Sequence, residues 1–479
     1  MIRKLNEYKN LAKNTLLFSL GTLGSTVISF FLVMIYTRYL TTSEYGMIDL
    51  INTTISLVVP VITLQITEAV FRFVMDEAID KQKLISTAIY FVCISTFLFF
   101  ITTIYFGRKY MPKEVVSLFY LLVVINAIIR VQTAFVKGLK RIKTLVTADI
   151  LSSIFMAIMI LIFLVKLQVG ITGYFIAIII SWIFKSSILC FKERMYNYLI
   201  SPFDKNLLKQ MLRYSVFLIP NAIIWWVVNV SDRYLLAYFL GVEAVGIYAV
   251  SYKIPQLLSI PTMIFYQAWQ ISAVESYKSE NRDQVYTNVF TVYLALLMIS
   301  LSIFLPLLKP LTSILFSSSF YESWKYASFL LFGTVFSALS SFSGTVYIAS
   351  KESKGALLTS SIAALINAGV NIILIPVWGI YAASFSTFLA YFIMWVARMQ
   401  HIKRFANVRL NLKKFIVSFF ITVLQMLTLY VSLSRFELFA IHTTALVLIL
   451  VIFRREVINL IKIGTDLGRE VIKFRVYTK

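Results

Sequence analysis

Two basic residues stand inside stretches of sequence that are otherwise apolar. Arg130 lies in the run IIRV, and Lys253 follows Tyr248 and Tyr252, whose spacing puts both tyrosines on nearly one face of a helix. Asp49 lies in a third apolar stretch. A charged side chain is costly to bury in an apolar segment, so each of these is a candidate functional residue by default. The two cations favour binding of an anionic group, because charge-assisted hydrogen bonds strengthen in a medium of low dielectric.

No catalytic or metal-binding pattern accompanies these charges. The chain lacks a phosphate-binding G-x-x-x-x-G-K-[ST] motif and a nucleophile elbow, and His401 and His442 are its only histidines. Its two cysteines, Cys93 and Cys190, both fall in apolar stretches, which argues against a disulfide framework and a Cys/His metal site. A membrane glycosyltransferase or polymerase would carry larger polar regions than this chain offers. We therefore expect no enzyme, no catalytic residue, no metal and no bound cofactor.

The segments that hold the charged residues are long enough to cross a membrane. With 59% hydrophobic and 14% charged residues and a mean hydropathy of +0.83, the chain has more apolar surface than a soluble core could bury. Apolar runs of about 20 residues, without the alternation of a barrel strand, predict helices. The fold class is therefore an all-α integral membrane protein of about 14 transmembrane helices. The predicted spans are residues 15–36, 47–66, 84–105, 115–135, 145–165, 171–189, 214–230, 245–265, 289–308, 326–348, 356–375, 380–396, 415–431 and 438–452.

The distribution of the basic residues predicts the orientation of these spans. The net charge is +23, but most of the 45 Lys and Arg residues fall in alternate short loops, as the positive-inside rule requires, so we expect no nucleic-acid partner. This pattern places both termini in the cytoplasm. Residues 454–479 have apolar positions at helical spacing among charges, which predicts a cytoplasmic amphipathic tail that contacts membrane lipids.

The sequence also contains a weak internal repeat with an offset of about 200 residues. At this offset Lys13 aligns with Arg213, and the turn Leu40 to Gly46 aligns with Leu240 to Gly246. An even number of spans separates the copies, so both are inserted in the same direction, as in known transporters with parallel repeats. We therefore expect two pseudo-symmetric six-helix lobes around a central cavity. The predicted divisions are residues 1–200 for the N-terminal lobe, 201–408 for the C-terminal lobe, 409–453 for two further helices and 454–479 for the tail.

Two stretches carry a resemblance to a known family: NTLLFSLGTLGSTVISFFLVMIYTRYLTTSEYGMIDL near the start, and LRYSVFLIPNAIIWWVVNVSDRYLLAYFLGVEAVGIYAVSYKI in the second repeat. In these the chain resembles the oligosaccharide and polysaccharide flippases of the Wzx type, in the multidrug and oligosaccharidyl-lipid exporter superfamily. The resemblance implies export of a polyprenyl-pyrophosphate-linked oligosaccharide across a bacterial cytoplasmic membrane by alternating access of two lobes. It also implies partners in the same pathway, namely a polysaccharide polymerase and glycosyltransferases.

The resemblance gives the charged residues candidate roles. Arg130 and Lys253 are the best candidates to bind the pyrophosphate, although Arg130 could instead be a packing residue and Lys253 could reach the outer interface. Lys13 and Arg213 would attract the anion at the cavity entrance, unless the positive-inside bias alone explains them. The polar or aromatic lining would include Asp49, Tyr248, Tyr252 and Trp225. The adjacent pair Asp232 and Arg233 is interpreted as a local ion pair at the outer end of the seventh span.

Other functions remain open on the sequence alone. A small-molecule or multidrug antiporter of the same superfamily is the main alternative, although a cavity for cationic drugs should be lined by acids. A flippase for lipid-linked peptidoglycan precursor and a non-transporting scaffold of a saccharide-assembly complex are the others. For a transporter we expect an ion gradient or the membrane potential to drive the cycle, since the chain has no ATP-binding loop.

Overall fold

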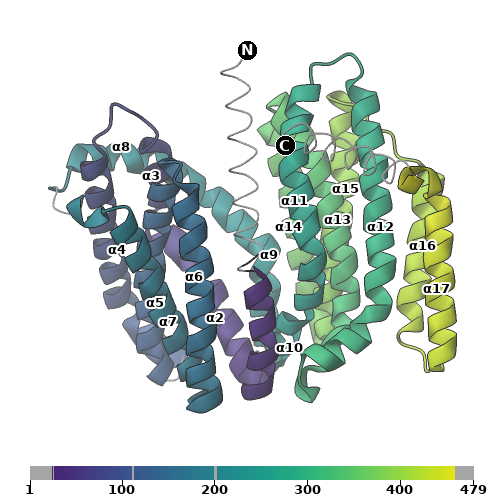
Figure 1. Ribbon diagram of the computed structural model, residues 1–479, viewed down its shortest axis with the longest axis horizontal. Coiled ribbons are helices and arrows are strands. Elements are labelled where there is room, and N and C mark those ends of the chain that lie inside the picture. Colours follow the sequence, from purple (N-terminus) through teal and green to yellow (C-terminus); the bar gives the residue numbers. More distant parts are fainter. Residues whose placement is uncertain (1–23, 25, 111–112, 199–201, 459–479) are drawn as a thin grey trace, which may run out of the picture. The chain divides into compact units, whose positions relative to one another are not determined.

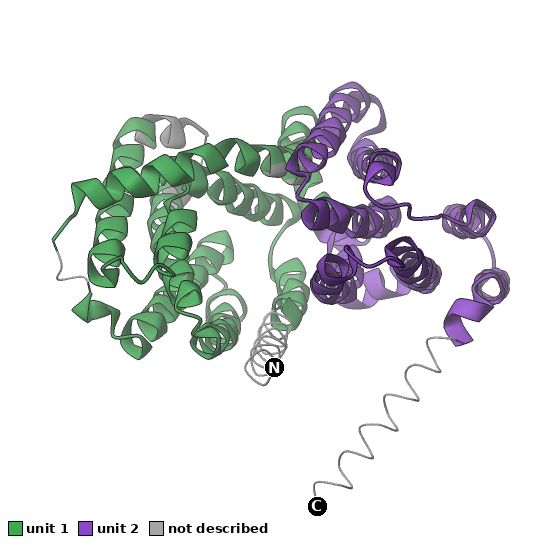
Figure 2. Ribbon diagram, turned by 90° about the horizontal axis from the view of Figure 1, so that it is seen from above, with its two compact units in different colours: residues 1–249 green, residues 250–479 purple. Residues whose placement is uncertain are grey.

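A computed structural model describes residue 24 and residues 26–110, 113–198 and 202–458 of the chain. Within this part the protein is helical throughout and contains no β-strand, as the apolar runs predict (Figure 1). The helices group into two compact units, residues 1–249 and residues 250–479 (Figure 2). The boundary between these units falls inside the predicted eighth span. The lobe divisions inferred from the repeat stay a prediction.

Unit 1 holds a helix at Thr26–Tyr39, helices α2 to α9 and all but the last two residues of α10. Their bounds are α2 Thr42–Ile62, α3 Ile66–Phe73, α4 Lys81–Tyr110, α5 Lys113–Gly138, α6 Ile142–Ile160, α7 Gly170–Lys192, α8 Lys205–Ser215, α9 Ile219–Leu240 and α10 Val242–Ser251. A π-helical turn, Leu161–Lys166, extends α6, and short 3₁₀ turns follow α7 and α8. α7 packs against both α5 and α6, and α3 packs against α5 and α8.

Unit 2 holds helices α11 to α17. Their bounds are α11 Lys253–Ser276, α12 Arg282–Leu315, α13 Ser323–Ser350, α14 Ser353–Trp378, α15 Ile380–His401, α16 Leu412–Thr428 and α17 Arg435–Ile452. α13 and α15 pack along each other, with α14 against α15 and α11 against α13, while α16 and α17 pack against α12. Among the ten helices of the described residues that could span a membrane, α13 is the most enclosed, with 72% of its apolar segment buried.

Ten helices in the described residues are long and apolar enough to cross a membrane. They include the 34-residue α12 and the extended segment Ile142–Lys166. Shorter apolar helices, Thr26–Tyr39 and Val242–Ser251, lie where two further spans are predicted. The protein is therefore a multi-pass membrane protein, whereas the total of 14 spans stays a prediction. The amphipathic tail is also still a prediction, because residues 459–479 lie outside the described part of the chain.

Several span boundaries differ from the sequence-based ones, and the ninth span, expected over residues 289–308, is α12 over Arg282–Leu315. The seventh span, expected to end at residue 230, continues as α9 to Leu240. The eighth, expected to be continuous over residues 245–265, is divided between α10 and α11 at Tyr252. Pro255 explains this break, because a proline ring clashes with the carbonyl four residues earlier, here that of Ser251. The twelfth, expected to end at residue 396, continues as α15 to His401.

Candidate functional site

Arg130 lies on α5, within the membrane span Val116–Gly138, and is partly buried. Its Nε donates a hydrogen bond of 2.8 Å to Oδ1 of Asn126, one turn earlier on the same helix. This neutral partner satisfies one of the five N–H donors of the guanidinium and leaves its charge uncompensated. Arg130 therefore keeps donors available for a further group.

A cavity of about 420 Å³ opens beside Arg130 within unit 1. It is lined by residues of α3, α5 and α7, namely Thr67, Glu68, Phe71, Asn126, Ile129, Arg130, Thr133, Ala134, Lys137, Trp182 and Lys185. The α5 residues recur at spacings of three and four because one face of a helix repeats with that period. The volume lies within the range of about 300–1,000 Å³ that small-molecule sites occupy. We call this cavity the α3–α5–α7 pocket.

The charge of the α3–α5–α7 pocket is predominantly positive. Arg130, Lys137 and Lys185 supply three cations, against the single carboxylate of Glu68. Lys137 also lies 5.3 Å from the centre of the Phe71 ring, and its position is thereby restricted by a cation–π contact. Cations that converge in a membrane segment, where the dielectric is low, favour an anionic ligand.

One pocket cation already has an acidic partner. Nζ of Lys185 on α7 lies 2.7 Å from Oδ1 of Asp149 on α6, and the two side chains are 19% and 35% exposed. Trp182 stands one turn before Lys185 on the same helix, so an aromatic ring borders the cations. The pocket thus combines donors for a phosphate oxygen with an apolar ring and with amide and hydroxyl groups. Groups of these kinds can hold an anion beside an apolar face.

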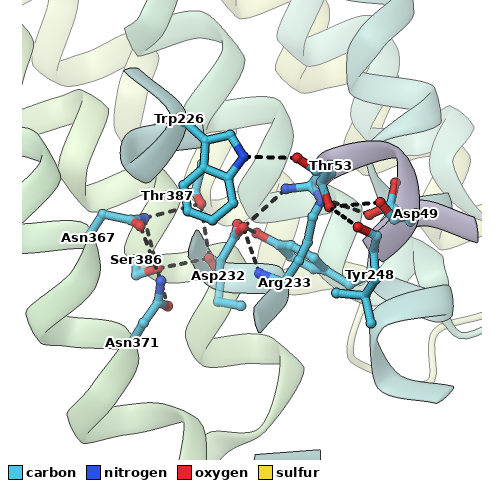
Figure 3. Close-up of polar contacts among 12 residues, drawn as sticks. Asp49, Thr53, Trp226, Asp232, Arg233, Tyr248, Asn367, Asn371, Ser386 and Thr387 are labelled. Atoms are coloured by element: carbon cyan, nitrogen blue, oxygen red, sulfur yellow. Dashed lines mark hydrogen bonds and ion pairs between the residues drawn. The ribbon is translucent and has the colours of Figure 1, made fainter. Parts of the chain in front are cut away.

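A second polar cluster in unit 1 joins α2, α9 and α10 (Figure 3). Nε of Arg233 lies 2.8 Å from Oδ2 of Asp49, and its Nη1 lies 3.1 Å from Oδ1 of Asp232. The hydroxyl of Tyr248 donates to Oδ2 of Asp232, and the Arg233 guanidinium stands over the Tyr248 ring. Two carboxylates against one guanidinium give this cluster a formal charge of −1. A backbone hydrogen bond also stabilises the cluster, because the main-chain N–H of Arg233 donates to Oδ1 of Asp232.

This cluster corrects the interpretation of Asp232 and Arg233 as a local pair at the end of a span. Both residues lie about two turns before the end of α9 at Leu240, with only 2% and 11% of their side chains exposed. The ion pair also reaches α2, 184 residues away in sequence, through Asp49. It therefore fixes α2 against α9 inside the protein instead of shaping an outer loop. On the same helices, Trp226 donates to the carbonyl oxygen of Thr53 at 3.0 Å (Figure 3).

The remaining sequence-based candidates are spread over the chain. Lys253 and Tyr252 lie at the break between α10 and α11, so Lys253 begins a helix instead of lying two turns inside one. Tyr248 is fully buried. Arg213 is exposed in the last turn of α8. Lys13 and the side chain of Trp225 lie outside the described part of the structure. The roles of all six in transport stay predictions.

Unit 2 contains polar groups that the sequence analysis did not single out. Asn367 and Asn371 on α14 bond to each other at 3.2 Å, and Ser386 on α15 donates to Oδ1 of Asn371 at 2.5 Å (Figure 3). Asn367 also lies 3.5 Å from the hydroxyl of Thr387. All four side chains are buried and uncharged, so this cluster joins two membrane helices by hydrogen bonds alone.

Arg398 is the other residue that the sequence analysis missed. It lies on α15 and is 6% exposed, although the predicted span ended before it. A usable signal was present, because Ala390, Met394 and Arg398 recur every four residues and all three are buried. The charge itself lowered the local hydropathy and ended the predicted span too early.

Comparison with known proteins agrees with this fold. Residues 11–270 match the family model described as polysaccharide biosynthesis protein. The lipid II flippase MurJ in an inward closed conformation superposes with a TM-score of 0.68 at 15% identity, over 92% of this chain and 100% of that one. An inward-facing multidrug resistance MATE family transporter of the MOP superfamily gives 0.63 at 13% identity, over 80% and 95%.

A MATE transporter from Vibrio cholerae gives a TM-score of 0.58 at 14% identity, over 83% of this chain and 97% of that one. No protein of curated function matches the sequence significantly. The structural neighbours are flippases and transporters, and at these identities they establish the fold. The family model covers more than half of the chain, and this protein therefore belongs to the polysaccharide biosynthesis protein family, with the fold of MOP-superfamily flippases and transporters.

Proposed function

We propose that this protein flips a polyprenyl-pyrophosphate-linked oligosaccharide across the bacterial cytoplasmic membrane for polysaccharide biosynthesis. The observation that carries the proposal is the α3–α5–α7 pocket, in which Arg130, Lys137 and Lys185 converge beside Trp182. A pyrophosphate requires several charge-assisted donors, and the adjoining sugar requires an aromatic face and hydroxyl partners. At about 420 Å³ the pocket suits the pyrophosphate and the first sugar, and the rest of the saccharide would extend from it.

The proposed cycle is alternating access by two lobes, without catalysis by this chain. Lys253, Lys13 and Arg213 would attract the anionic headgroup on its way to the pocket. The cycle would be driven by an ion gradient or by the membrane potential. Both termini would lie in the cytoplasm, where a polysaccharide polymerase and glycosyltransferases of the same pathway are the expected partners. The membrane lipids and the lipid-linked oligosaccharide would be its immediate ligands.

The test is transport by the purified protein in liposomes. A polyprenyl-pyrophosphate-linked oligosaccharide with a fluorescent sugar is placed in both leaflets, and its flipping is followed by loss of protection from an impermeant reagent. We expect Arg130→Gln combined with Lys137→Gln to reduce the rate at least tenfold, because two of three pocket cations are lost. Lys278→Gln is the matched control, since Lys278 is exposed and lies outside the pocket.

Cargo selectivity distinguishes the alternatives in the same assay. The wild-type protein should flip the pyrophosphate-linked saccharide and leave a neutral polyprenyl-linked saccharide of the same sugars in place. Export of a cationic dye without flipping of either saccharide would identify a drug antiporter. Preferential flipping of a lipid-linked peptidoglycan precursor would identify that cargo. Absence of movement for every cargo, with correctly inserted protein, would leave a scaffold and end the proposal.

A further inference from the structure

Arg398 is a buried cation whose hydrogen-bond partners are all neutral. Its Nε donates to Oγ1 of Thr359 at 3.1 Å and its Nη2 to Oγ of Ser360 at 3.0 Å, both on α14. Its Nη1 donates to the backbone oxygen of Ser340 on α13 at 2.9 Å. The guanidinium thus links three helices of unit 2. Three of its five donors are used, and two remain.

No Asp or Glu of the described residues forms an ion pair with Arg398. The ionisable groups nearest to its charge are the phenol hydroxyls of Tyr266, Tyr347 and Tyr391, which are neutral at physiological pH. A guanidinium stays protonated, so it cannot avoid the cost of burial by losing its charge. An uncompensated charge inside a membrane protein is among the most expensive features a fold can hold.

The surroundings of Arg398 are rich in donors and poor in negative charge. The hydroxyl of Ser340 is buried and has no hydrogen-bond partner in the structure. The hydroxyl of Thr359 accepts from Arg398 and donates to the backbone oxygen of Gly355 at 2.9 Å, whereas that of Ser360 accepts from Arg398 and keeps its proton for another group. A buried polar atom without a partner calls for an explanation, and a bound ion is one of the usual ones. Here the available donors specify an anion.

The corresponding helices of unit 1 contain an acidic partner for their cation, and the Arg398 cluster does not. By helix order within the repeat, α5, α6 and α7 correspond to α13, α14 and α15. The cation of α7, Lys185, is paired with the carboxylate of Asp149 on α6 at 2.7 Å. The cation of α15, Arg398, meets only the hydroxyls of Thr359 and Ser360 on α14. The second unit therefore retains the cation and lacks the acid.

We propose that the Arg398 cluster of unit 2, formed by Arg398, Ser340, Thr359 and Ser360, binds a small monovalent anion such as chloride. The anion supplies the negative charge that Asp149 supplies in unit 1. Only a small ion is compatible with the close packing here, because a Cβ placed on Gly344 would stand 3.0 Å from Nη1 of Arg398. With 6% exposure of the residue, the site has no room for a lipid headgroup. It is separate from the α3–α5–α7 pocket and independent of the cargo proposed above.

The experiment measures the thermal stability of the full-length protein in detergent micelles. Tryptophan fluorescence follows unfolding in potassium gluconate, potassium chloride and potassium phosphate at equal ionic strength. A ligand that binds the folded state raises the unfolding midpoint in a saturable way. We expect chloride to raise the midpoint by a few degrees over gluconate. An equal midpoint in all three salts, or a rise in phosphate only, would overturn the proposal.

Ser360→Asp is the decisive variant, because it places a carboxylate where Ser360 now bonds to Arg398. Its midpoint in gluconate should match that of the wild type in chloride, and it should no longer respond to chloride. A Ser360→Asp protein that keeps the full chloride response would locate the anion elsewhere and refute the site. Glu352→Gln is the control for the acid at the start of α14, and it should leave the chloride response unchanged. Loss of the response in Glu352→Gln would contradict the assignment of the anion to Arg398.

Discussion

Gly46 on α2 and Gly246 on α10 lie backbone against backbone. A Cβ built on Gly46 would stand 2.0 Å from the carbonyl oxygen of Val242, and one built on Gly246 would stand 1.9 Å from that of Thr42. The contact is reciprocal, since residues 42 and 46 are related to 242 and 246 by the same offset of 200. A hydrogen bond of 3.1 Å from Thr42 to Glu243 supports the crossing. The two copies of the repeat thus meet at equivalent glycines.

Substitution of Gly46 by Ala should destabilise the protein by about 1–3 kcal/mol, the usual cost of overpacking. The added methyl group cannot fit, because the nearest atom is backbone and cannot rotate away. Gly369→Ala is the matched control, since Gly369 lies in α14 and has no atom within 4 Å of its built Cβ. The control should be neutral or slightly stabilising, as alanine is the better helix former. Equal midpoints for the two variants in thermal unfolding would contradict the crossing.

Neutralising Asp232 should cost more stability than neutralising Asp49. Asp232→Asn removes the charged acceptor of Tyr248 and of Nη1 of Arg233 at a buried position, but it leaves Arg233 paired with Asp49, so we expect a loss of about 1–3 kcal/mol. Asp49→Asn should cost less, because the Asp49 side chain is 22% exposed and Arg233 keeps Asp232. Unfolding midpoints in detergent provide the comparison.

The control for this pair is Asp283→Asn, which breaks the exposed ion pair with Arg282. Exposed ion pairs contribute roughly 0–1 kcal/mol, so its midpoint should remain close to that of the wild type. A larger effect at Asp283 than at Asp232 would show that burial does not govern these charges.

The predicted orientation can be tested with single cysteines in a protein whose Cys93 and Cys190 are replaced by serine. Cysteines at Lys140, Lys205 and Arg404 should resist an impermeant thiol reagent applied to intact cells, because the positive-inside rule places them in the cytoplasm. A cysteine at Lys109 should react. Labelling of all four after permeabilisation confirms that each is accessible. Reaction of any of the first three from outside would invert or break the topology.

An inside-negative potential should accelerate flipping of a pyrophosphate-linked cargo. Each charge that crosses the membrane gains or loses about 2.3 kcal/mol per 100 mV, and outward movement of a dianion is favoured. Return of an empty cationic pocket toward the inside is favoured by the same field. Liposomes with imposed potentials, and with proton or sodium gradients, provide the measurement. If the transport rate depends on neither the potential nor the ion gradients, but requires ATP with no other protein present, this mechanism is refuted.

The membrane fold was predictable from the sequence because it depends on local composition. Long apolar runs specify spanning helices wherever they occur, since lipid offers the backbone no other partner. The placement of Arg130 inside a span followed from the same argument, and the span Val116–Gly138 contains it. Span ends were less predictable: the charge of Arg398 ended one predicted helix too early, and the effect of Pro255 on the helix before it was overlooked.

Only the tertiary structure decided which charges meet. Asp49 contacts Arg233 across 184 positions, and Arg398 reaches Ser340 across 58. Hydropathy predicts that burying a charge is costly. It cannot predict which residue offsets this cost, because that residue lies on another helix. The same holds for the α3–α5–α7 pocket, whose cations come from two helices that pack side by side. The sequence by itself determined that the chain crosses the membrane and carries charge into it, and helix packing alone decided whether each charge is paired.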